Sequence, residues 1–304
     1  VVTCGSTEAM MATMLSITNP GDKVVIFSPF YENYGADTIL SGAEPIYVPL
    51  VPPEFHFDKE KLEDAFRQGA KALILCNPSN PCGKVFTMEE MQTIAELAKK
   101  YDAYVVTDEV YEHIVYAPYK HIYMQSLEGM RERTIVCNSL SKTYSITGWR
   151  LGYVIANPQI IDRVKKVHDF LTVGAAAPLM EAAVVGLEFG DGYYDELAAH
   201  YAHMKEVFVG GLKKLGLKYT DPQGAYYVLV DVSEFGVKDD VKFCEWMAQF
   251  VGVAAVPGSS FFREDVHNLV RFHFAKQDDT LNEAIKRLAT LKEKAMNAKN
   301  VDWR

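Results

Sequence analysis

Short apolar runs rich in valine and isoleucine alternate, through the first half of the chain, with longer stretches whose apolar residues recur at helical spacing. Such runs are typical of strands buried on both faces of a sheet, and parallel strands need helical crossovers between them. The helical stretch TMEEMQTIAELAKKY opens with Thr87 as a predicted N-cap and has Glu90 three residues later. The runs are KVVIFSP, EPIYVPL, KALILCNP, AYVVTDE, TIVCNS and LGYVIAN. The pattern predicts an α/β fold with a mainly parallel, helix-covered sheet.

The pattern changes near residue 190. The stretch YYDELAAHYAHMKEVFVGGLKKLG predicts one long helix that ends at Gly216 and joins two domains. Beyond it, the strands GAYYVLVDV and NLVRFHFA and the helices DDVKFCEWMAQF and DTLNEAIKRLATLKEKA predict a smaller α+β unit. We therefore place a large domain at residues 1–192, and the linker helix with a small C-terminal domain at residues 193–304.

Composition narrows the class of protein. The chain has 304 residues, of which 49% are hydrophobic, and a formal net charge of −9 with its basic residues scattered, so we expect no nucleic-acid partner. No apolar run is long enough to span a membrane, and we expect no membrane partner. Five cysteines without metal-like spacing predict a reduced, cytoplasmic setting and no metal site.

The opening turn CGSTEA places Gly5, Ser6 and Thr7 between the end of a strand and the start of a helix. Free N–H groups at a helix N-terminus, beside two hydroxyls, can bind a phosphate. An ordinary N-cap with a flexible glycine explains the same residues, so this turn needs partners before it predicts a site.

The stretch NSLSKTYSITGWRLGY supplies such partners, because it follows the buried run RTIVC. Ser139, Ser141 and Arg150 could bind an anion, most simply a phosphate, at the sheet edge. Lys142 would then be free to react. A partly desolvated amine near another cation has a lowered pKa and is a competent nucleophile towards an aldehyde.

Further candidates follow other strands, and each alone has an ordinary structural explanation. Tyr31 could stack on a flat ligand or lie in the core, and Asn80 in NPSNPCG could bind a ligand or form a plain turn. Asp108 and Tyr111 in TDEVYEH could face one ligand, or Asp108 could cap a helix. Arg271 in LVRFHFA could bind a carboxylate or form a structural salt bridge.

Together and in this order, these residues resemble the class I/II aminotransferases, the fold-type I enzymes that use pyridoxal 5′-phosphate. The resemblance covers nearly the whole chain and is most specific at NPSNPCG, TDEVYEH and SLSKTYSITGWRLGY. It implies the fold-type I architecture, the cofactor pyridoxal phosphate, and transamination from an L-amino acid to a 2-oxo acid, with 2-oxoglutarate as the expected acceptor, by a ping-pong mechanism.

The resemblance also implies a role for each candidate. Lys142 would form a Schiff base with the cofactor and carry the proton, and Asp108 would hold the pyridine nitrogen protonated. Asn80 and Tyr111 would bond the phenolic oxygen, and Tyr31 would stack on the ring. The phosphate would be bound by Gly5, Ser6, Thr7, Ser139, Ser141 and Arg150. Arg271, with Asn80, would bind the substrate carboxylate.

Two departures from the family pattern stand out. Cys82 occupies the place where relatives usually have threonine, a small-for-small replacement. The chain also opens at a strand that family members precede with an N-terminal segment, so we expect that segment to be missing here. The resemblance further implies a homodimer with active sites at the subunit interface.

Two other functions fit the same residues. A β-lyase on this scaffold would expel a β-substituent, as from a cysteine conjugate, and the sequence scarcely separates it from a transaminase. A non-catalytic module that binds pyridoxal phosphate would belong to another class of protein. The full set of polar candidates, and the absence of any DNA-binding pattern from the sequence, disfavour that module.

Overall fold

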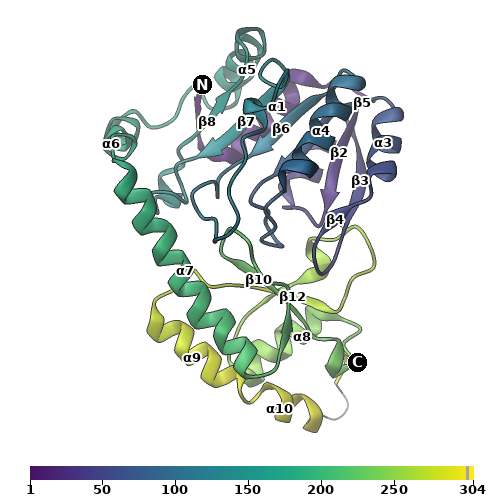
Figure 1. Ribbon diagram of the computed structural model, residues 1–304, viewed down its shortest axis with the longest axis vertical. Helices are drawn as coiled ribbons and strands as arrows, with labels where there is room; N and C mark the ends of the chain where they lie inside the picture. The colour runs from purple at the N-terminus through teal and green to yellow at the C-terminus, as the bar shows by residue number, and fades with distance from the viewer. Residues whose placement is uncertain (299–300) are drawn as a thin grey trace.

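A computed structural model describes residues 1–298 and 301–304, and it contains two sheets (Figure 1). The larger has eight strands in the order β1-β8-β7-β6-β5-β2-β3-β4. The central pairs β3–β2, β2–β5, β5–β6 and β6–β7 are parallel, whereas β8, β1 and β4 join antiparallel. The strands are β1 (Val2–Thr3), β2 (Lys23–Ser28), β3 (Glu44–Val51), β4 (His56–Phe57), β5 (Ala70–Cys76), β6 (Tyr104–Asp108), β7 (Thr134–Ser139) and β8 (Gly152–Ile155). The predicted α/β fold with a mainly parallel sheet is confirmed.

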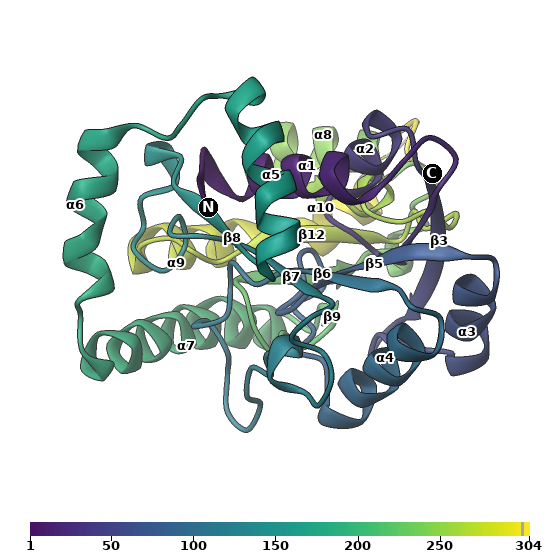
Figure 2. The same ribbon diagram turned by 90° about the horizontal axis from the view of Figure 1, so that it is seen from above.

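Helices cover both faces of this sheet (Figure 2). Successive side chains of a strand point to opposite faces, so Val24 and Ile26 pack on one side and Val25 and Phe27 on the other. The first core includes α1 and α5, the second α3 and α4. The helices of this part are α1 (Gly5–Ile17), α2 (Asn33–Leu40), α3 (Lys59–Arg67), α4 (Met88–Lys100) and α5 (Pro158–Leu171). Burial on both faces explains why the strands are continuous apolar runs.

Helix boundaries follow local capping chemistry. The side chain of Thr87 accepts a hydrogen bond from the backbone N–H of Glu90, whose carboxylate accepts one from the Thr87 N–H, so the predicted N-terminus of α4 is confirmed. The predicted long helix is α7 (Asp191–Lys214), followed by Gly216 with a φ of +66°. A separate helix, α6 (Ala177–Leu187), precedes it.

The second sheet is antiparallel, with the order β11-β12-β10-β9, and it packs with α7 and the C-terminal helices around its own core (Figure 1). Its elements are β9 (Lys218–Tyr219), β10 (Tyr227–Asp231), α8 (Asp240–Trp246), β11 (Val256–Pro257), β12 (Leu269–His273), α9 (Asp278–Leu288) and α10 (Leu291–Asn297). The α+β character of this part agrees with the prediction. The domain boundary at residues 192 and 193, inside α7, stays a prediction.

Two predicted helices differ in detail. The terminal helix is divided into α9 and α10 by Ala289 and Thr290. The stretch DDVKFCEWMAQF is α-helical only to Trp246 and continues as one π-helical turn, Met247–Val251, that ends at Gly252 with a φ of +79°. Apolar periodicity does not distinguish one continuous helix from two consecutive ones, because the packing of the small part decides where the chain bends.

Candidate active site

The carboxyl ends of the parallel strands and the start of α1 enclose a cavity of about 180 Å³. Open α/β sheets bind ligands at this edge, where loops from several strands converge. Most of the predicted residues line this cavity: Ser6, Thr7, Tyr31, Asn80, Asp108, Tyr111, Ser139, Ser141, Lys142 and Arg150. Gly5 and Arg271 do not line it themselves, but each contacts a residue that does, as described below.

One end of the cavity is suited to an anion. Helix α1 starts at Gly5 with no side-chain cap, so the N–H groups of its first turn remain available. Gly5 has a φ of +81°, and a Cβ there would collide with the Arg150 guanidinium, so only glycine lets the cation approach. The buried Ser139, at the end of β7, and Ser141, just after it, line the same cavity. A helix N-terminus, hydroxyls and a cation together match a phosphate group.

Lys142 lines the cavity together with Arg150 of the anion end and the acid Asp108. Its side chain is half-buried, and desolvation lowers the pKa of the ammonium group. The charge of Arg150 lowers this pKa further, while the Asp108 carboxylate opposes both effects. The surroundings therefore increase the fraction of Lys142 present as the neutral, nucleophilic amine.

Asp108 ends β6 and is buried, and its carboxylate accepts a 2.7 Å hydrogen bond from the Tyr34 hydroxyl and a 3.3 Å bond from the Val110 N–H. Burial raises the pKa of this carboxyl, while those hydrogen bonds and the Lys142 charge favour the ionised form. A buried carboxylate held in place is a suitable partner for a cationic ring nitrogen.

Tyr111 and Asn80 connect the cavity to the small sheet. The Tyr111 hydroxyl lies 2.9 Å from the Tyr227 hydroxyl, and desolvation raises the pKa of Tyr111 well above its usual value, which keeps the phenol neutral. Arg271 donates from Nη1 to the Asn80 side-chain oxygen over 2.7 Å. The guanidinium also packs on the rings of Tyr227 and Phe261, with Cζ 4.5 and 4.3 Å from their centroids. Arg271 therefore lies beside the cavity.

Several residues that line the cavity are not predicted by the sequence. These are Tyr34, Cys76, Val110, Thr147 and Tyr227. Tyr34 and Thr147 stand within the same motifs as predicted residues, so helical spacing from Tyr31 and proximity to Arg150 could have indicated them. Tyr227 lies in a strand of the second part, and local sequence gives no sign that it reaches this cavity.

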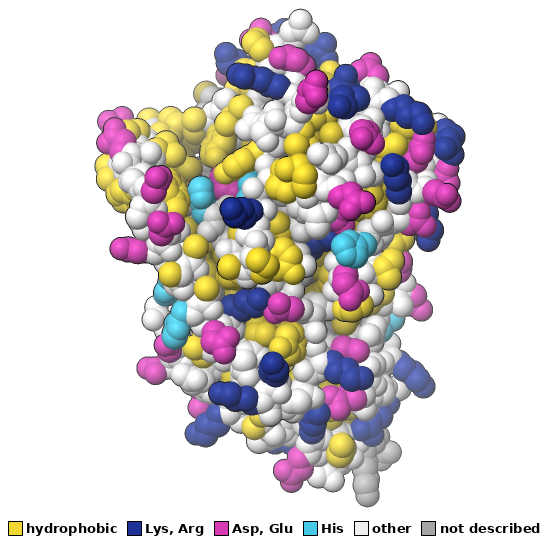
Figure 3. Space-filling model, in the orientation of Figure 1, with side chains coloured by type: hydrophobic (Ala, Val, Ile, Leu, Met, Phe, Trp, Pro, Cys, Tyr) yellow, Lys and Arg dark blue, Asp and Glu magenta, His cyan; other side chains and the backbone are white. Residues whose placement is uncertain are grey.

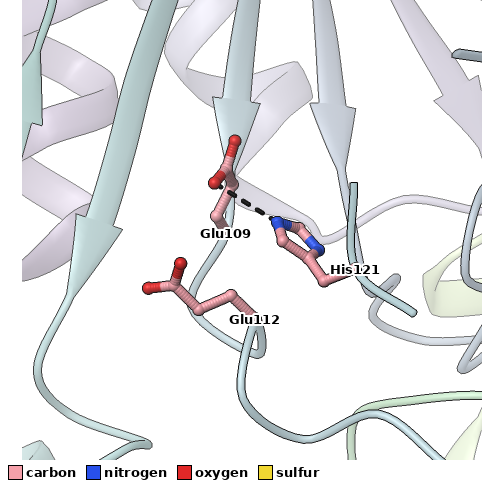
Figure 4. A group of neighbouring side chains, drawn as sticks. All are labelled: Glu109, Glu112 and His121. Carbon is pink, nitrogen blue, oxygen red and sulfur yellow. Dashed lines mark hydrogen bonds and ion pairs between the residues drawn. The ribbon is translucent and has the colours of Figure 1, made fainter. Parts of the chain in front are cut away.

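A second group of polar side chains lies on the loop that follows β6, directly after Asp108 (Figure 4). Glu109 faces His121 at 3.4 Å, and Glu112 accepts a 2.7 Å hydrogen bond from the Asn138 amide. Ligand atoms of Glu109, Glu112 and His121 lie within 4.8 Å of one another, although Nδ1 of His121, which has no hydrogen-bond partner among the described residues, points away from the two carboxylates. The contact of Glu109 with His121 and the hydrogen bond of Glu112 with Asn138 support the loop after β6, which explains the acidity of TDEVYEH.

The cavity fits pyridoxal phosphate in its distribution of chemical groups. Its anion end suits the phosphate, Lys142 suits the aldehyde, and Asp108 suits the ring nitrogen. The parallel sheet, the helix start and the lysine together define the fold-type I class of pyridoxal-phosphate enzymes.

Comparison with known proteins identifies the family within that class. The model of the family "Aminotransferase class I and II" matches residues 1–288, and the chain belongs to this family. The protein is a pyridoxal-phosphate-dependent aminotransferase.

Individual members of the family are similar to this chain over most of their own length. The probable N-succinyldiaminopimelate aminotransferase DapC of Mycobacterium tuberculosis is 36% identical over 97% of this chain and 77% of its own length. The solved structure of the N-succinyldiaminopimelate aminotransferase from that organism superposes with a TM-score of 0.91 over 96% of this chain and 77% of that chain. The methionine aminotransferase of Escherichia coli is 33% identical over 95% of this chain and 75% of its own length. Human kynurenine–oxoglutarate transaminase 3 is 33% identical over 93% of this chain and 69% of its own length.

Proposed function

We propose that Ser6, Thr7, Ser139, Ser141 and Arg150 hold the phosphate of the cofactor, at the helix start that Gly5 leaves open. Tyr31 packs on the ring, and Asn80 and Tyr111 bond its phenolic oxygen. The convergence of a free helix N-terminus, two buried hydroxyls and a guanidinium supports this placement. Fixing the phosphate fixes the opposite end of the cofactor near Lys142.

Lys142 and Asp108 do the proton chemistry in this proposal. When bound, the cofactor supplies an aldehyde that takes up the amino group and a conjugated ring that accepts the electron pair of a cleaved Cα–H bond. Lys142 would hold the aldehyde end of the cofactor through Nζ, and the same atom would take up and return the Cα proton. Asp108 keeps a proton on the ring nitrogen, which favours electron acceptance by the ring. The lowered pKa of Lys142 supports the assignment, since a base must be neutral to take a proton.

Arg271 binds the substrate carboxylate, together with the Asn80 amide. The 2.7 Å hydrogen bond between Arg271 and Asn80 and the two rings against the guanidinium support this role, because they hold the guanidinium against residues that line the cavity. A fixed carboxylate orients the Cα–H bond for cleavage and explains a preference for α-amino acids. We further propose 2-oxoglutarate as the acceptor, which the names of the kynurenine–oxoglutarate relatives support.

A half-reaction experiment tests the proposed function. The purified protein, loaded with pyridoxal phosphate, is mixed with glutamate, methionine, kynurenine or N-succinyldiaminopimelate, and the absorbance of the bound aldehyde form is followed. We expect its loss with at least one amino acid and its return with 2-oxoglutarate. No spectral change with any donor contradicts the proposal. Pyruvate and ammonia released from a cysteine conjugate without a 2-oxo acid would indicate the β-lyase instead.

We also propose a homodimer in a cytoplasmic setting. Large apolar side chains are exposed on α6 and the segments that flank it, and a hydrophobic surface is visible over α6 in Figure 3. These side chains are Phe170, Leu171, Val173, Val184, Val185, Leu187 and Phe189. An exposed apolar surface of this kind marks an interaction site, and a second copy would cover it. Sedimentation of the holoprotein as a monomer at micromolar concentration would contradict the dimer.

All five cysteines are free thiols, which supports a reducing compartment. Among the described residues, no helix is both long and apolar enough to cross a membrane. Compartment-specific fractionation tests the cytoplasmic assignment.

A further inference from the structure

Tyr227 contacts both a residue proposed to bind the cofactor and the residue proposed to bind the substrate carboxylate. It is the first residue of β10, only 9% exposed, and it lines the cavity although it belongs to the small sheet. Its hydroxyl is 2.9 Å from the Tyr111 hydroxyl, and its ring centroid is 4.5 Å from Cζ of Arg271. One side chain therefore contacts a residue proposed to bind the cofactor and the residue proposed to bind the substrate carboxylate.

The antiparallel register brings Tyr227 and Arg271 together. Tyr227 is paired with His273 and Leu229 with Arg271, so Tyr227 and Arg271 are diagonal neighbours on one face of the sheet. Diagonal pairs on a sheet lie within reach of aromatic and long side chains. With Phe261 also packed against the guanidinium at 4.3 Å and Asn80 bonded to Nη1, Arg271 has few rotamers left. An arginine held in this way binds a carboxylate with less loss of side-chain entropy.

The hydroxyl pair has a directional consequence. A neutral phenol has one proton to donate and two lone pairs that accept. If the Tyr227 hydroxyl donates to the Tyr111 oxygen, the proton of Tyr111 points to the ligand in the cavity. The titratable and charged groups around Tyr111 are Tyr227, the edge-on Tyr226 and, in the cavity, Asp108, Lys142 and Arg150. The Tyr227 hydroxyl makes the 2.9 Å hydrogen bond to the Tyr111 hydroxyl, and burial, Tyr227 and Tyr226 together raise the pKa of Tyr111.

We propose that Tyr227 is a positioning residue that couples the two ends of the site: its ring orients Arg271 towards the substrate carboxylate, and its hydroxyl orients Tyr111 towards the phenolic oxygen of the cofactor. The inference rests on the proposed roles of Arg271 and Tyr111 and adds the residue that joins them. The two contacts use different parts of one side chain, so two substitutions can separate them.

The test compares Tyr227→Phe, which removes only the hydroxyl, with Tyr227→Leu, which removes the ring as well. The first readout is a pH titration of the absorbance of the holoprotein without any amino acid. The second is the donor concentration that gives half of the spectral change in the half-reaction. For Tyr227→Phe we expect the titration midpoint to shift by about half a pH unit or more. The donor concentration that gives half of the spectral change should stay within about twofold of the wild-type value. For Tyr227→Leu we expect both changes, with the donor concentration raised about tenfold or more.

Controls separate this inference from the proposed function. Tyr201→Phe removes the hydroxyl of another buried tyrosine, which stacks on Tyr226 and for which the described residues supply no side-chain hydrogen bond; it should shift neither readout. Tyr111→Phe and Arg271→Lys test the roles on which the inference rests, the first in the titration and the second in the donor response.

The outcomes are distinguishable. If Tyr111→Phe and Arg271→Lys act as expected but Tyr227→Phe leaves the midpoint unshifted, the coupling is wrong and the proposed function stands. The coupling is equally wrong if Tyr227→Leu leaves the donor response unchanged, or if Tyr227→Phe impairs both readouts in parallel. If Tyr111→Phe and Arg271→Lys are themselves without effect, the roles proposed for Tyr111 and Arg271 are wrong, and the coupling through Tyr227 is wrong with them. Circular dichroism identifies a variant that has lost its fold, and Tyr227→Phe still decides the hydroxyl contact if the Leu variant does not fold.

Discussion

The two parts of the molecule contribute to the site in different ways. In the larger part, the side chains that line the cavity come from the ends of parallel strands and from the start of α1, where the backbone leaves the sheet. In the smaller part, Arg271 and Tyr227 come from within antiparallel strands and reach the site across a sheet face. Parallel strands gather their carboxyl ends at one edge of a sheet, whereas neighbouring antiparallel strands end at opposite edges. The larger part thus supplies the proposed chemistry, and the smaller part supplies the proposed substrate recognition.

Replacing Lys142 by alanine should have the largest effect, because it removes the nucleophile and the proton carrier together. We expect kcat to fall by at least about 10⁴-fold. Borohydride reduction of the loaded protein followed by peptide mapping should attach the cofactor to the peptide that contains Lys142, and to no peptide in the variant. Lys61→Ala, at an exposed lysine of α3, is the matched control and should retain labelling and activity. Labelling at another lysine in the wild-type protein would contradict the assignment.

Replacing each of two adjacent carboxylates of the larger part by its amide should distinguish a residue of the proposed chemistry from a residue that stabilises the fold. Asp108→Asn should lower kcat about 10³-fold, since an amide does not hold a proton on the ring nitrogen. Glu109→Gln should leave kcat within a few-fold and lower the free energy of unfolding by about 1–3 kcal/mol, because it weakens a buried contact to His121. Steady-state kinetics and urea unfolding measure the two effects. Equal losses of kcat in both variants would show that the two carboxylates do not differ in role.

Changing the smaller part should alter recognition more than chemistry. Arg271→Lys keeps the charge but loses the planar fork and the stacking on two rings. We expect KM for the amino acid to rise about 10- to 100-fold, while kcat changes less. Initial-rate kinetics with varied donor and fixed 2-oxoglutarate provide the measurement. A fall in kcat with unchanged KM would place Arg271 in the chemical step and remove the contrast between the two parts.

A buried acid of the larger part that lies outside the cavity should affect stability alone. Asp37 is 6% exposed, its Oδ2 has no hydrogen-bond partner among the described residues, and burial raises the pKa of its carboxyl to about 6. Because the pKa is higher in the folded state, ionisation destabilises the fold progressively as the pH rises from about 4 to about 6, and the cost persists above that range. Asp37→Asn should therefore stabilise the protein by about 1–2 kcal/mol at pH 8 and have little effect at pH 4.

Thermal unfolding at the two pH values measures this difference, with Asp162→Asn at an exposed aspartate of α5 as the control. The same stabilisation at both pH values would show that the carboxyl charge is not its cause. The kcat of Asp37→Asn should equal that of the wild-type protein.

Local sequence was enough to predict the strands of the larger part apart from β4, the capping of α4, and the motifs that surround Asn80, Asp108 and Lys142. Strands buried on both faces are apolar throughout, and the polar residues of a loop at a strand end are neighbours in the sequence. Both features can therefore be recognised from local sequence. The tertiary structure alone decided that Tyr34 bonds Asp108, that Arg271 lies against Asn80, and that Tyr227 joins the two ends of the site. Those contacts link residues far apart along the chain, and each depends on the register of one sheet and its packing against another. A one-residue shift of β10 would turn Tyr227 to the opposite face, so local sequence alone does not specify the contact.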